Sequence, residues 1–415
     1  MLHRLISFLK DNRKPILAVA GVGILAIAAF GLFYPNGGTY LKRAAEKPAF
    51  IYRTTGDQTC EGCHRTLDPG IDEAWRKSVH YKANVGCADC HGDDHEAVFA
   101  AKGKVSAGQC GVCHEQIVED YATSMHAKAE VIVLSDARFV AQSTAMQEEG
   151  CMGCHATGTQ FADGSVGGCN ECHPGHEFSA EFARQPEACE VCHGGPDHPV
   201  SESYRTSVHG TLYFMDRDET KYPTCASCHM PDGFHGHVEN MTLGQILNGA
   251  VLEDQYYPAI PMKRITREEF DRNRKEMLAI CAPCHGTRFS RESLERADQI
   301  KMEADRILAE ASAIIEALYE DKLLDPMPED RPANPMVGHA LELGGQQLYE
   351  DTSKIEQMFF KLFKFYHPTT FKAAYHHSPD YTHWKGIVFM KMELDNIRSE
   401  AKKLRQLGKL KAQEG

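Results

Sequence analysis

The sequence predicts a mainly α-helical protein, and three observations support this class. The pentapeptide Cys-x-x-Cys-His occurs eight times, among short segments rich in Gly and Pro. The last part of the chain repeats apolar residues at helical spacing, and no segment alternates like a half-buried strand. With 42% hydrophobic and 25% charged residues the chain is globular. A net charge of −13 argues against nucleic acid as a partner, because phosphate binding needs clustered Lys and Arg.

Four zones follow one another along the chain. Residues 1–34 are expected to be a membrane anchor, because an apolar run from Pro15 to Tyr34 can span about 30 Å of hydrocarbon as a helix. The basic residues before this run predict that the N-terminus stays in the cytoplasm. The alternative is a cleaved signal peptide, with the small residues Ala26 and Ala28 at the cleavage site. Residues 35–56 are expected to form a linker.

The other two zones are 57–289, which holds every cysteine, and 290–415, which holds none and is expected to be a helical domain. Three helices are predicted in or near the last zone: one after residue 290, one over Ser353–Tyr366 that stops at His367-Pro368, and one from Trp384 toward Leu410. The first has an apolar face formed by Ile300, Ala304, Ile307, Leu308, Ala311, Ile314, Ile315 and Leu318, and is broken by Pro326, Pro328, Pro332 and Pro335. A capping box over Thr266–Glu269 begins a further helix that delivers Cys281.

All sixteen cysteines fall in the pentapeptide, so none remains for a disulfide or a thiolate nucleophile. Motifs 1 to 8 are Cys60-Cys63-His64, Cys87-Cys90-His91, Cys110-Cys113-His114, Cys151-Cys154-His155, Cys169-Cys172-His173, Cys189-Cys192-His193, Cys225-Cys228-His229 and Cys281-Cys284-His285.

This spacing is typical of covalent haem c attachment, in which two thiols hold one porphyrin and the adjacent His ligates its iron. Zinc knuckles usually pair two Cys-x-x-Cys units and do not require a His after each, and a redox dithiol would not need eight copies. The sequence therefore predicts eight covalently bound haem c groups. Haem c is attached on the outer side of the bacterial cytoplasmic membrane, which agrees with an exported chain. The haems are expected to form the core of 57–289, which explains a mean hydropathy of only −0.41.

Haems that only carry electrons usually have a second axial ligand, normally His or Met. Apart from the eight motif histidines and His3, thirteen of the 22 histidines remain. The nearest candidates along the sequence are His80 after motif 1, His95 after motif 2, His126 after motif 3, His176 after motif 5, His198 and His209 after motif 6, and His235 and His237 after motif 7, with His339 as a distant partner.

Motif 4 differs from the others because no further His separates His155 from motif 5. Its distal ligand either comes from elsewhere in the chain, or the sixth coordination position is open to a small molecule. The second alternative would make this haem a catalytic centre.

Several connecting segments resemble the octahaem cytochromes of the hydroxylamine oxidoreductase family. They are Cys110–Glu115 through Ser124–His126, Arg184–Cys189 leading into Gly194–His198, and Ala374–Trp384. The resemblance covers roughly residues 57–400. It implies a mostly helical multihaem fold, usually a homotrimer, in which the fourth haem binds the substrate nitrogen and the other seven pass electrons.

The resemblance also implies site residues. A distal Asp-His pair falls on Asp197 and His198; a His with an ordinary pKa of about 6.5 can give or take protons near neutrality. The alternative is that His198 ligates another haem, which would leave His209 free. Oxidative members carry a tyrosine of a neighbouring subunit bonded to the catalytic haem, here the haem of Cys151 and Cys154. The best match is Tyr381, then Tyr375. Reductive members lack this bond, and a Tyr in an aromatic tail is often simply packed.

The leading hypothesis is a membrane-associated, periplasmic-side oxidoreductase of small inorganic nitrogen compounds. In this hypothesis hydroxylamine is oxidised at the motif 4 haem. The electrons then pass through the other haems to a partner cytochrome or a quinone-linked membrane cytochrome. Alternatives are reduction of nitrite or hydroxylamine toward ammonia, a non-catalytic electron conduit, and a sulfur-oxyanion reductase. The direction depends on reduction potentials, which burial and hydrogen bonds to the ligands set.

Overall fold

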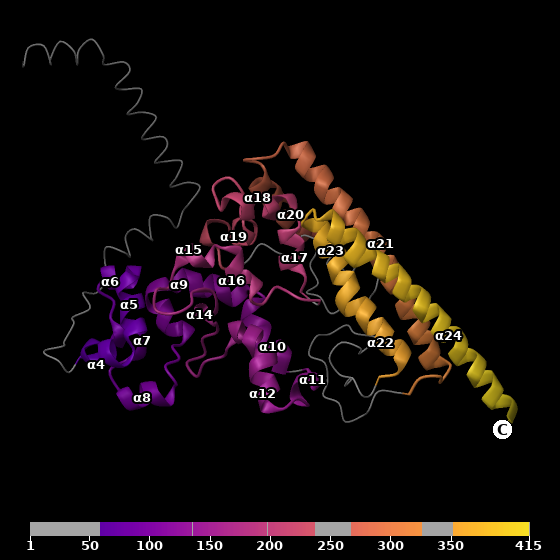
Figure 1. Cartoon of the computed structure of the whole chain (residues 1–415), viewed down its shortest axis with the longest axis horizontal. Helices are drawn as coiled ribbons and strands as arrows, with labels where there is room; N and C mark the ends of the chain where they lie inside the picture. The colour runs from indigo at the N-terminus through magenta and orange to yellow at the C-terminus, as the bar shows by residue number, and fades with distance from the viewer. Residues whose placement is uncertain (1–58, 135, 197, 237–266, 326–351, 415) are drawn as a thin grey trace, which may run out of the picture.

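The computed structural model describes residues 59–134, 136–196, 198–236, 267–325 and 352–414 (Figure 1). Within these ranges the β pairing is limited to one isolated antiparallel bridge between Gln160 and Val166. The prediction of a mainly α fold is therefore confirmed. The expected anchor and linker, residues 1–56, lie outside the described residues, and none of the helices described is long and apolar enough to cross a membrane.

The region that carries the motifs is built from short helices joined by turns, at the left of Figure 1. The motifs lie on or at the ends of α4 (Cys60–Leu67), α7 (Cys87–His91), α9 (Ala107–Thr123), η2 (Gln147–Cys151) with α13 (Met152–His155), α14 (Cys169–Cys172), α16 (Pro186–Glu190), α19 (Cys225–His229) and α20 (Arg267–Cys281).

The helices between them are short, and the polar N-caps Ser78, Asp94, Ser179 and Ser207 begin several of them by accepting a backbone N–H. They are α5 (Pro69–Lys77), α6 (Val79–Lys82), α8 (His95–Ala100), η1 (His126–Lys128), α10 (Ala129–Leu134), α11 (Ala137–Val140), α12 (Thr144–Met146), η3 (Ala156–Gly158), α15 (Ala180–Ala183), α17 (Val200–Arg205), α18 (Val208–Asp216) and η4 (Pro231–Gly233).

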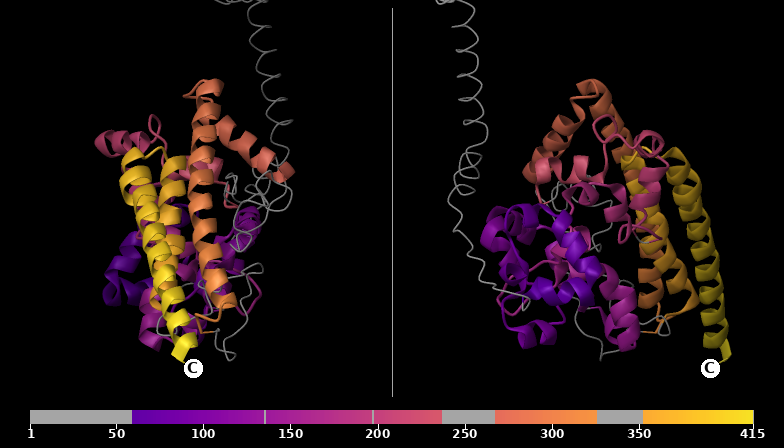
Figure 2. Two further views of the ribbon diagram at one scale, coloured as in Figure 1. Left: turned by 90° about the vertical axis from the view of Figure 1, so that its right-hand side faces the viewer. Right: turned by 60° about the vertical axis from the view of Figure 1, so that its left-hand side comes forward.

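The C-terminal part forms a bundle of helices that lie side by side, as Figures 1 and 2 show. α21 (Thr287–Glu320) packs against α22 (Lys354–Lys361), α23 (His367–Tyr375) and α24 (Val388–Glu414). The predicted apolar face of α21 is confirmed: six of its eight residues are buried, and Ile300 and Ile314 are half-buried. With Ile355, Phe359, Leu362, Met390 and Ile397 this face forms one continuous core.

The predicted end of the second helix at His367-Pro368 is wrong. The chain passes through a π-helical turn, η7 (Leu362–Tyr366), and continues as α23. Pro368 falls in the first turn of α23, where its missing N–H costs least. The carbonyl groups of Phe365 and Tyr366 accept hydrogen bonds from the hydroxyls of Thr369 and Thr370, both at 2.7 Å.

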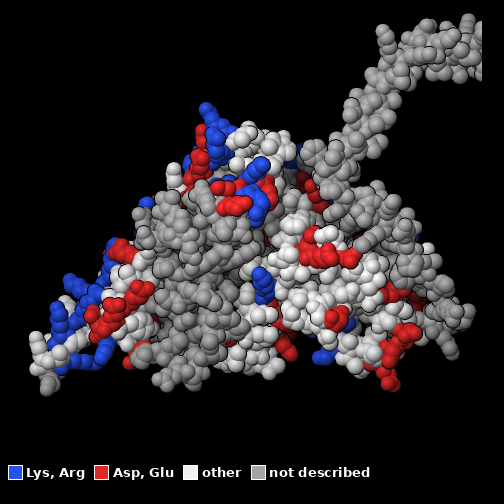
Figure 3. All heavy atoms as spheres, turned by 180° about the vertical axis from the view of Figure 1, so that it is seen from behind, with Lys and Arg blue, Asp and Glu red and all other residues white. Residues whose placement is uncertain are grey.

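The third predicted helix is confirmed, although it begins earlier, with the π-helical turn η8 (Tyr381–Ile387) that leads into α24. Just before it, the hydroxyls of Ser378 and of Thr206 at the end of α17 share a hydrogen bond of 2.6 Å. This bond fixes the segment to the motif region of its own chain. Basic side chains gather along the end of α24 (Figure 3), where Lys402, Lys403, Arg405, Lys409 and Lys411 are exposed. α20 ends at Cys281 as predicted, whereas Thr266 and the four helix-breaking prolines lie outside the described residues.

Candidate haem sites and active site

Seven of the eight motif histidines face a second histidine that belongs to no motif. Their ring centres lie 5.7 to 6.4 Å apart. The pairs, with the motif His first, are His64–His95, His91–His176, His114–His80, His173–His235, His193–His126, His229–His376 and His285–His209.

This spacing fits a haem iron between two imidazoles. An imidazole–metal bond is about 2 Å long, so two axial ligands hold their nitrogens about 4 Å apart and their ring centres about 6 Å apart. In the closest pair, the Nε2 atoms of His126 and His193 are 3.4 Å apart. Each pair also joins one His that follows two cysteines to one that does not. These residues could therefore hold haems with two axial histidines, which suits electron transfer.

The partners are not the nearest histidines in the sequence. His95 faces motif 1 and not motif 2, His176 faces motif 2 and not motif 5, and His80 and His126 face motifs 3 and 6. His235 faces motif 5, and His209 faces motif 8. Sequence order failed here because an axial ligand only has to reach the other face of the porphyrin, and neighbouring short helices supply it. His237 and His339 lie outside the described residues.

The sequence analysis missed His376, which faces His229 of motif 7. It lies 147 positions further along the chain, on the C-cap of α23. Its only signal was its place in the segment Ala374–Trp384, which carried part of the family resemblance. The C-terminal bundle is thus part of the haem-binding structure, because it supplies one histidine of the candidate haem site at motif 7.

Burial favours the neutral imidazoles that metal binding requires. Burial first, then the neighbouring imidazoles of His126 and His198, lowers the pKa of His193 to about 3. Burial and the imidazole of His229 lower the pKa of His376 to about 4. Burial likewise lowers the pKa values of His126 and His209.

Motif 4 is built differently. The Nδ1 of His155 lies 2.7 Å from the carbonyl oxygen of Ala129, the first residue of α10, which orients the ring. Gly158 makes this possible, because a Cβ there would come within 2.6 Å of the backbone nitrogen of Glu130 and 2.7 Å of that of Ala129. Within the described ranges no histidine ring faces His155, in contrast to the seven paired motifs.

Two predicted site residues lie on the segments around motif 6. The ring of His198 lies 6.2 Å from that of His193, and the thiol of Cys154 of motif 4 is near enough to Cys192 of motif 6 to help raise its pKa. His198 therefore lies near motif 6, and its distance from His193 falls within the range of the seven pairs, so His126 and His198 both face the motif 6 site. Asp197 lies outside the described residues.

The two candidate tyrosines lie in different places. Burial, then the carboxylates of Glu202 and Asp380, raises the pKa of Tyr381. Glu202 accepts a 2.8 Å hydrogen bond from the backbone N–H of Gly195, so Tyr381 lies near the loop that leads to His198. Tyr375 instead donates a 2.5 Å hydrogen bond to Asp298 and packs with Cys228 and Cys281, beside motifs 7 and 8.

Cysteines of different motifs that lie near one another indicate the order of the motifs in space. The neighbours are Cys60 and Cys87, Cys90 and Cys110, Cys110 and Cys169, Cys172 and Cys189, Cys189 and Cys225, and Cys228 and Cys281. The motifs therefore follow the series 1, 2, 3, 5, 6, 7, 8, and motif 4 joins this series at motif 6 through Cys154 and Cys192. This arrangement has one branch point, at motif 6, and three ends, at motifs 1, 4 and 8, between which electrons can pass.

The motifs and their packing define a multihaem c-type cytochrome. The chain belongs to the family described as seven times multi-haem cytochrome CxxCH, whose model matches residues 121–332, about half of the chain. A second model, described as cytochrome c554 and c-prime, matches residues 37–92, which contain motifs 1 and 2. The chain therefore binds several haems covalently through its Cys-x-x-Cys-His motifs.

Two curated relatives narrow the relationship. A probable nitrite reductase-hydroxylamine oxidoreductase fusion protein of Kuenenia stuttgartiensis is 28% identical over 450 residues, which cover 84% of this chain and 52% of that protein. The C-type polyheme cytochrome OmcC of Geobacter sulfurreducens is 24% identical over 247 residues, 56% of this chain and 26% of that protein. The chain thus spans about half the length of the first relative and about a quarter of the second.

Solved structures agree with this placement. The reducing HAO-like protein complex of Kuenenia stuttgartiensis matches with a TM-score of 0.70 and 26% identity, over 86% of both chains. A hypothetical multiheme protein shares the fold, with a TM-score of 0.65 and 20% identity over 90% of this chain and 99% of that one. The chain is a distant relative of HAO-like proteins.

Proposed function

We propose that this protein is an octahaem oxidoreductase of small inorganic nitrogen compounds, with its active site at the motif 4 haem. One observation carries the proposal: among the described residues, seven motif histidines face a second histidine and His155 faces none. A haem held at motif 4 supplies an iron to which a substrate nitrogen can bind. The seven other haems exchange electrons with it.

The residues of the chain have distinct tasks in this proposal. His155 ligates the iron, and its bond to the carbonyl of Ala129 fixes the orientation of its ring. His198 gives protons to, or takes them from, the bound nitrogen compound, because each electron pair moves together with protons. Asp197 is proposed to orient His198. The contact between Cys154 and Cys192 makes motif 6 the connection through which electrons reach or leave motif 4.

For the direction we propose reduction of nitrite or hydroxylamine toward ammonia. The support is the match to the complex described as reducing HAO-like, over 86% of both chains. The second candidate is hydroxylamine oxidation, the direction favoured by the family resemblance of the sequence.

Two assays on the purified, haem-loaded protein test the function: nitrite or hydroxylamine reduction with a strong electron donor, and hydroxylamine oxidation with an artificial acceptor. His198→Ala should keep all haems and lower turnover by about 10²–10⁴-fold. His383→Ala is the matched control, because His383 is exposed and its ring meets that of Trp384 edge-on. Wild-type turnover in His198→Ala, or no turnover of nitrogen compounds in the wild type, would contradict the proposal.

The haem inventory gives a second test. Intact mass should show eight haems, and electron paramagnetic resonance should show one site that shifts on addition of cyanide or nitric oxide. Eight low-spin haems that bind no added ligand would make the protein an electron conduit.

A proteolytic digest distinguishes the two directions. If the protein oxidises hydroxylamine, peptides containing Tyr381 should co-migrate with the haem peptide of Cys151 and Cys154. A free Tyr381 peptide in full yield supports the reductive direction, and Tyr375 should be followed in the same digest.

For localisation we propose a single N-terminal anchor in the cytoplasmic membrane, with the haem region on the periplasmic side, on the basis of the apolar run in residues 1–34. Secretion after cleavage is the alternative. The proposed partners are a redox cytochrome, soluble or quinone-linked, and two further copies of the chain in a homotrimer. Membrane fractionation, N-terminal sequencing and light scattering test these points.

A further inference from the structure

The motif histidine at one end of the series, His64, contacts a different kind of group from three other haem-site histidines. At motif 1, the Nδ1 of His64 lies 2.9 Å from Oδ2 of Asp68. The corresponding Nδ1 atoms of His155, His235 and His376 contact backbone carbonyl oxygens at 2.6 to 2.7 Å. His64 thus has a carboxylate partner where these three have neutral ones.

The geometry assigns the proton in this contact. His64 faces His95 across the motif 1 site, so its Nε2 is the atom that binds iron and must carry no proton. Nδ1 then carries the hydrogen and donates it to the Asp68 carboxylate. A charged acceptor draws this hydrogen more strongly than a carbonyl does, and leaves more negative charge on the imidazole.

The position of Asp68 is fixed by its own backbone. Asp68 lies between α4 and α5, its N–H donates to the carbonyl of His64 at 2.8 Å, and Pro69 follows it at the start of α5. Its carbonyl accepts the N–H of Ile71 at 3.0 Å. The carboxylate is therefore held four residues after His64 on the same side of the turn, although it is about half exposed.

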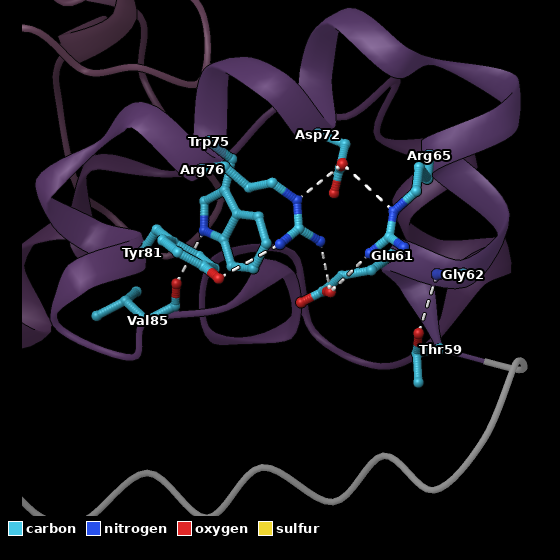
Figure 4. A network of polar contacts seen from close by, with 9 residues as sticks. All are labelled: Thr59, Glu61, Gly62, Arg65, Asp72, Trp75, Arg76, Tyr81 and Val85. Atoms are coloured by element: carbon cyan, nitrogen blue, oxygen red, sulfur yellow. Dashed lines mark hydrogen bonds and ion pairs between the residues drawn. The ribbon is translucent and has the colours of Figure 1, made fainter.

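The neighbouring cations are engaged elsewhere, which leaves the charge of Asp68 to His64. Arg76 pairs with Asp72 at 2.9 Å and with Glu61 at 3.0 Å, and Arg65 lies 3.6 and 3.7 Å from the same two carboxylates. Figure 4 shows both guanidinium groups between Glu61 and Asp72, with Arg76 also against the rings of Trp75 and Tyr81. This network holds α4 against α5 without neutralising Asp68.

We propose that Asp68 is a positioning residue that lowers the reduction potential of the motif 1 haem through His64. A more negative imidazole stabilises ferric over ferrous iron, so the potential falls. Motif 1 is one end of the series, so electrons held there are more strongly reducing than they would be if His64 had a neutral hydrogen-bond partner. The inference rests on haem attachment at motif 1 and not on the nitrogen chemistry proposed for motif 4.

Spectroelectrochemical titration of the full haem-loaded protein tests this. Asp68→Asn keeps a hydrogen-bond acceptor but removes the charge, and should shift one haem component to higher potential while the others stay. A His95→Met variant identifies the motif 1 component by its altered spectrum. Asp68→Glu, which retains a carboxylate, should restore most of the wild-type potential.

Asp93→Asn is the matched control, because it removes one charge two residues from His95 without a contact to either imidazole. It should leave the motif 1 component in place. An unchanged titration in Asp68→Asn, a shift in a different haem, or an equal shift in Asp93→Asn would overturn the proposal.

Discussion

The motif region and the C-terminal bundle are packed in different ways. The bundle has a continuous core in which Leu308, Ile315, Phe359 and Met390 are fully buried and touch one another. In the motif region the buried apolar residues are scattered and many are small, such as Ala107, Ala127 and Ala188. A chain that buries little of its own apolar surface must obtain its interior from another source, and the eight attachment motifs supply it.

The two regions therefore differ in the source of their stability. The bundle is stabilised by burial of its own side chains, whereas the motif region depends on covalently bound groups that also fix its short helices in place. Helices of four to nine residues, such as α6, α13 and α14, are too short to be stable alone. The predictions below test this division.

The largest effect should follow from loss of the haems. In a chain produced without haem attachment, residues 59–236 should lose protection against hydrogen exchange, while α21 and α24 keep theirs. The cause is that only the bundle retains its core. Hydrogen-exchange mass spectrometry of the haem-free and haem-loaded chains measures this. Equal protection of both regions in the haem-free chain would show that the motif region has a side-chain core of its own.

The next effect concerns a buried ionic cluster inside the bundle. The Nζ of Lys301 lies 2.6 and 2.8 Å from the two carboxylate oxygens of Asp305, and Nε2 of His367 lies 2.6 Å from one of them. All three side chains are 5% exposed, and the cluster joins α21 to α23. Asp305→Asn would leave the Lys301 charge buried without its partner.

We expect Asp305→Asn to lower the free energy of unfolding of the bundle by about 3–5 kcal/mol. Glu303→Gln is the matched control on the same helix, because Glu303 pairs with Lys391 in solvent and should cost about 0–1 kcal/mol. Denaturant unfolding followed by far-ultraviolet circular dichroism compares the two. A loss in Asp305→Asn no larger than in Glu303→Gln would mean that the cluster adds nothing to the packing of the bundle.

A smaller effect should appear as a pH dependence. Burial alone would raise the pKa of the Asp305 carboxyl, but Lys301 and His367 outweigh it and hold the pKa at about 2, below its ordinary value of 3.8. The lowered pKa contributes about 2 kcal/mol that is present above pH 4 and is lost as the pH falls toward 2. Burial also lowers the pKa of His367 below its ordinary value of 6.5. The stability of the bundle therefore falls further as the pH drops below 6.5, because the unfolded chain then binds a proton that the buried imidazole does not.

The measurement is the difference in bundle stability between wild type and Asp305→Asn as a function of pH. This difference should be constant from pH 7 down to about pH 5 and shrink below pH 4. Protonation then removes the negative charge of Asp305 in the wild type, as the substitution to Asn already has in the variant. A difference that stays constant to pH 2 would contradict the assignment.

The same contrast explains what the sequence could predict. The face of α21 was predictable because burial against one neighbouring surface imposes the 3.6-residue period on the apolar residues themselves. The continuation of the helix through Pro368 was not, because it depends on a π-helical turn and on the hydroxyls of Thr369 and Thr370, which satisfy the carbonyls upstream.

In the motif region, the attachment residues were predictable because the chemistry of one haem requires them within a stretch of five residues. The second ligands were not, because they meet the haem through space: His376 reaches His229 from another part of the chain, and His80 faces motif 3 although motif 1 is the motif that it follows. The sequence sets His155 apart because no His separates it from motif 5, and in the part of the chain that the structure describes no histidine ring faces it.

The smallest expected effect tests whether the bundle core and the haem-filled motif region unfold separately. Ile315→Val removes one methylene from a side chain that is fully buried in the bundle core, and should cost about 0.5–1.5 kcal/mol. Ile314→Val, at the adjacent half-buried position, removes the same group and should cost less. If the bundle is packed independently of the haems, the loss should appear in unfolding followed by circular dichroism while haem absorbance changes at its wild-type denaturant concentration. A parallel shift of both signals in Ile315→Val would show instead that the bundle and the motif region unfold as one unit, through contacts such as that of His376 with His229 and that of Ser378 with Thr206.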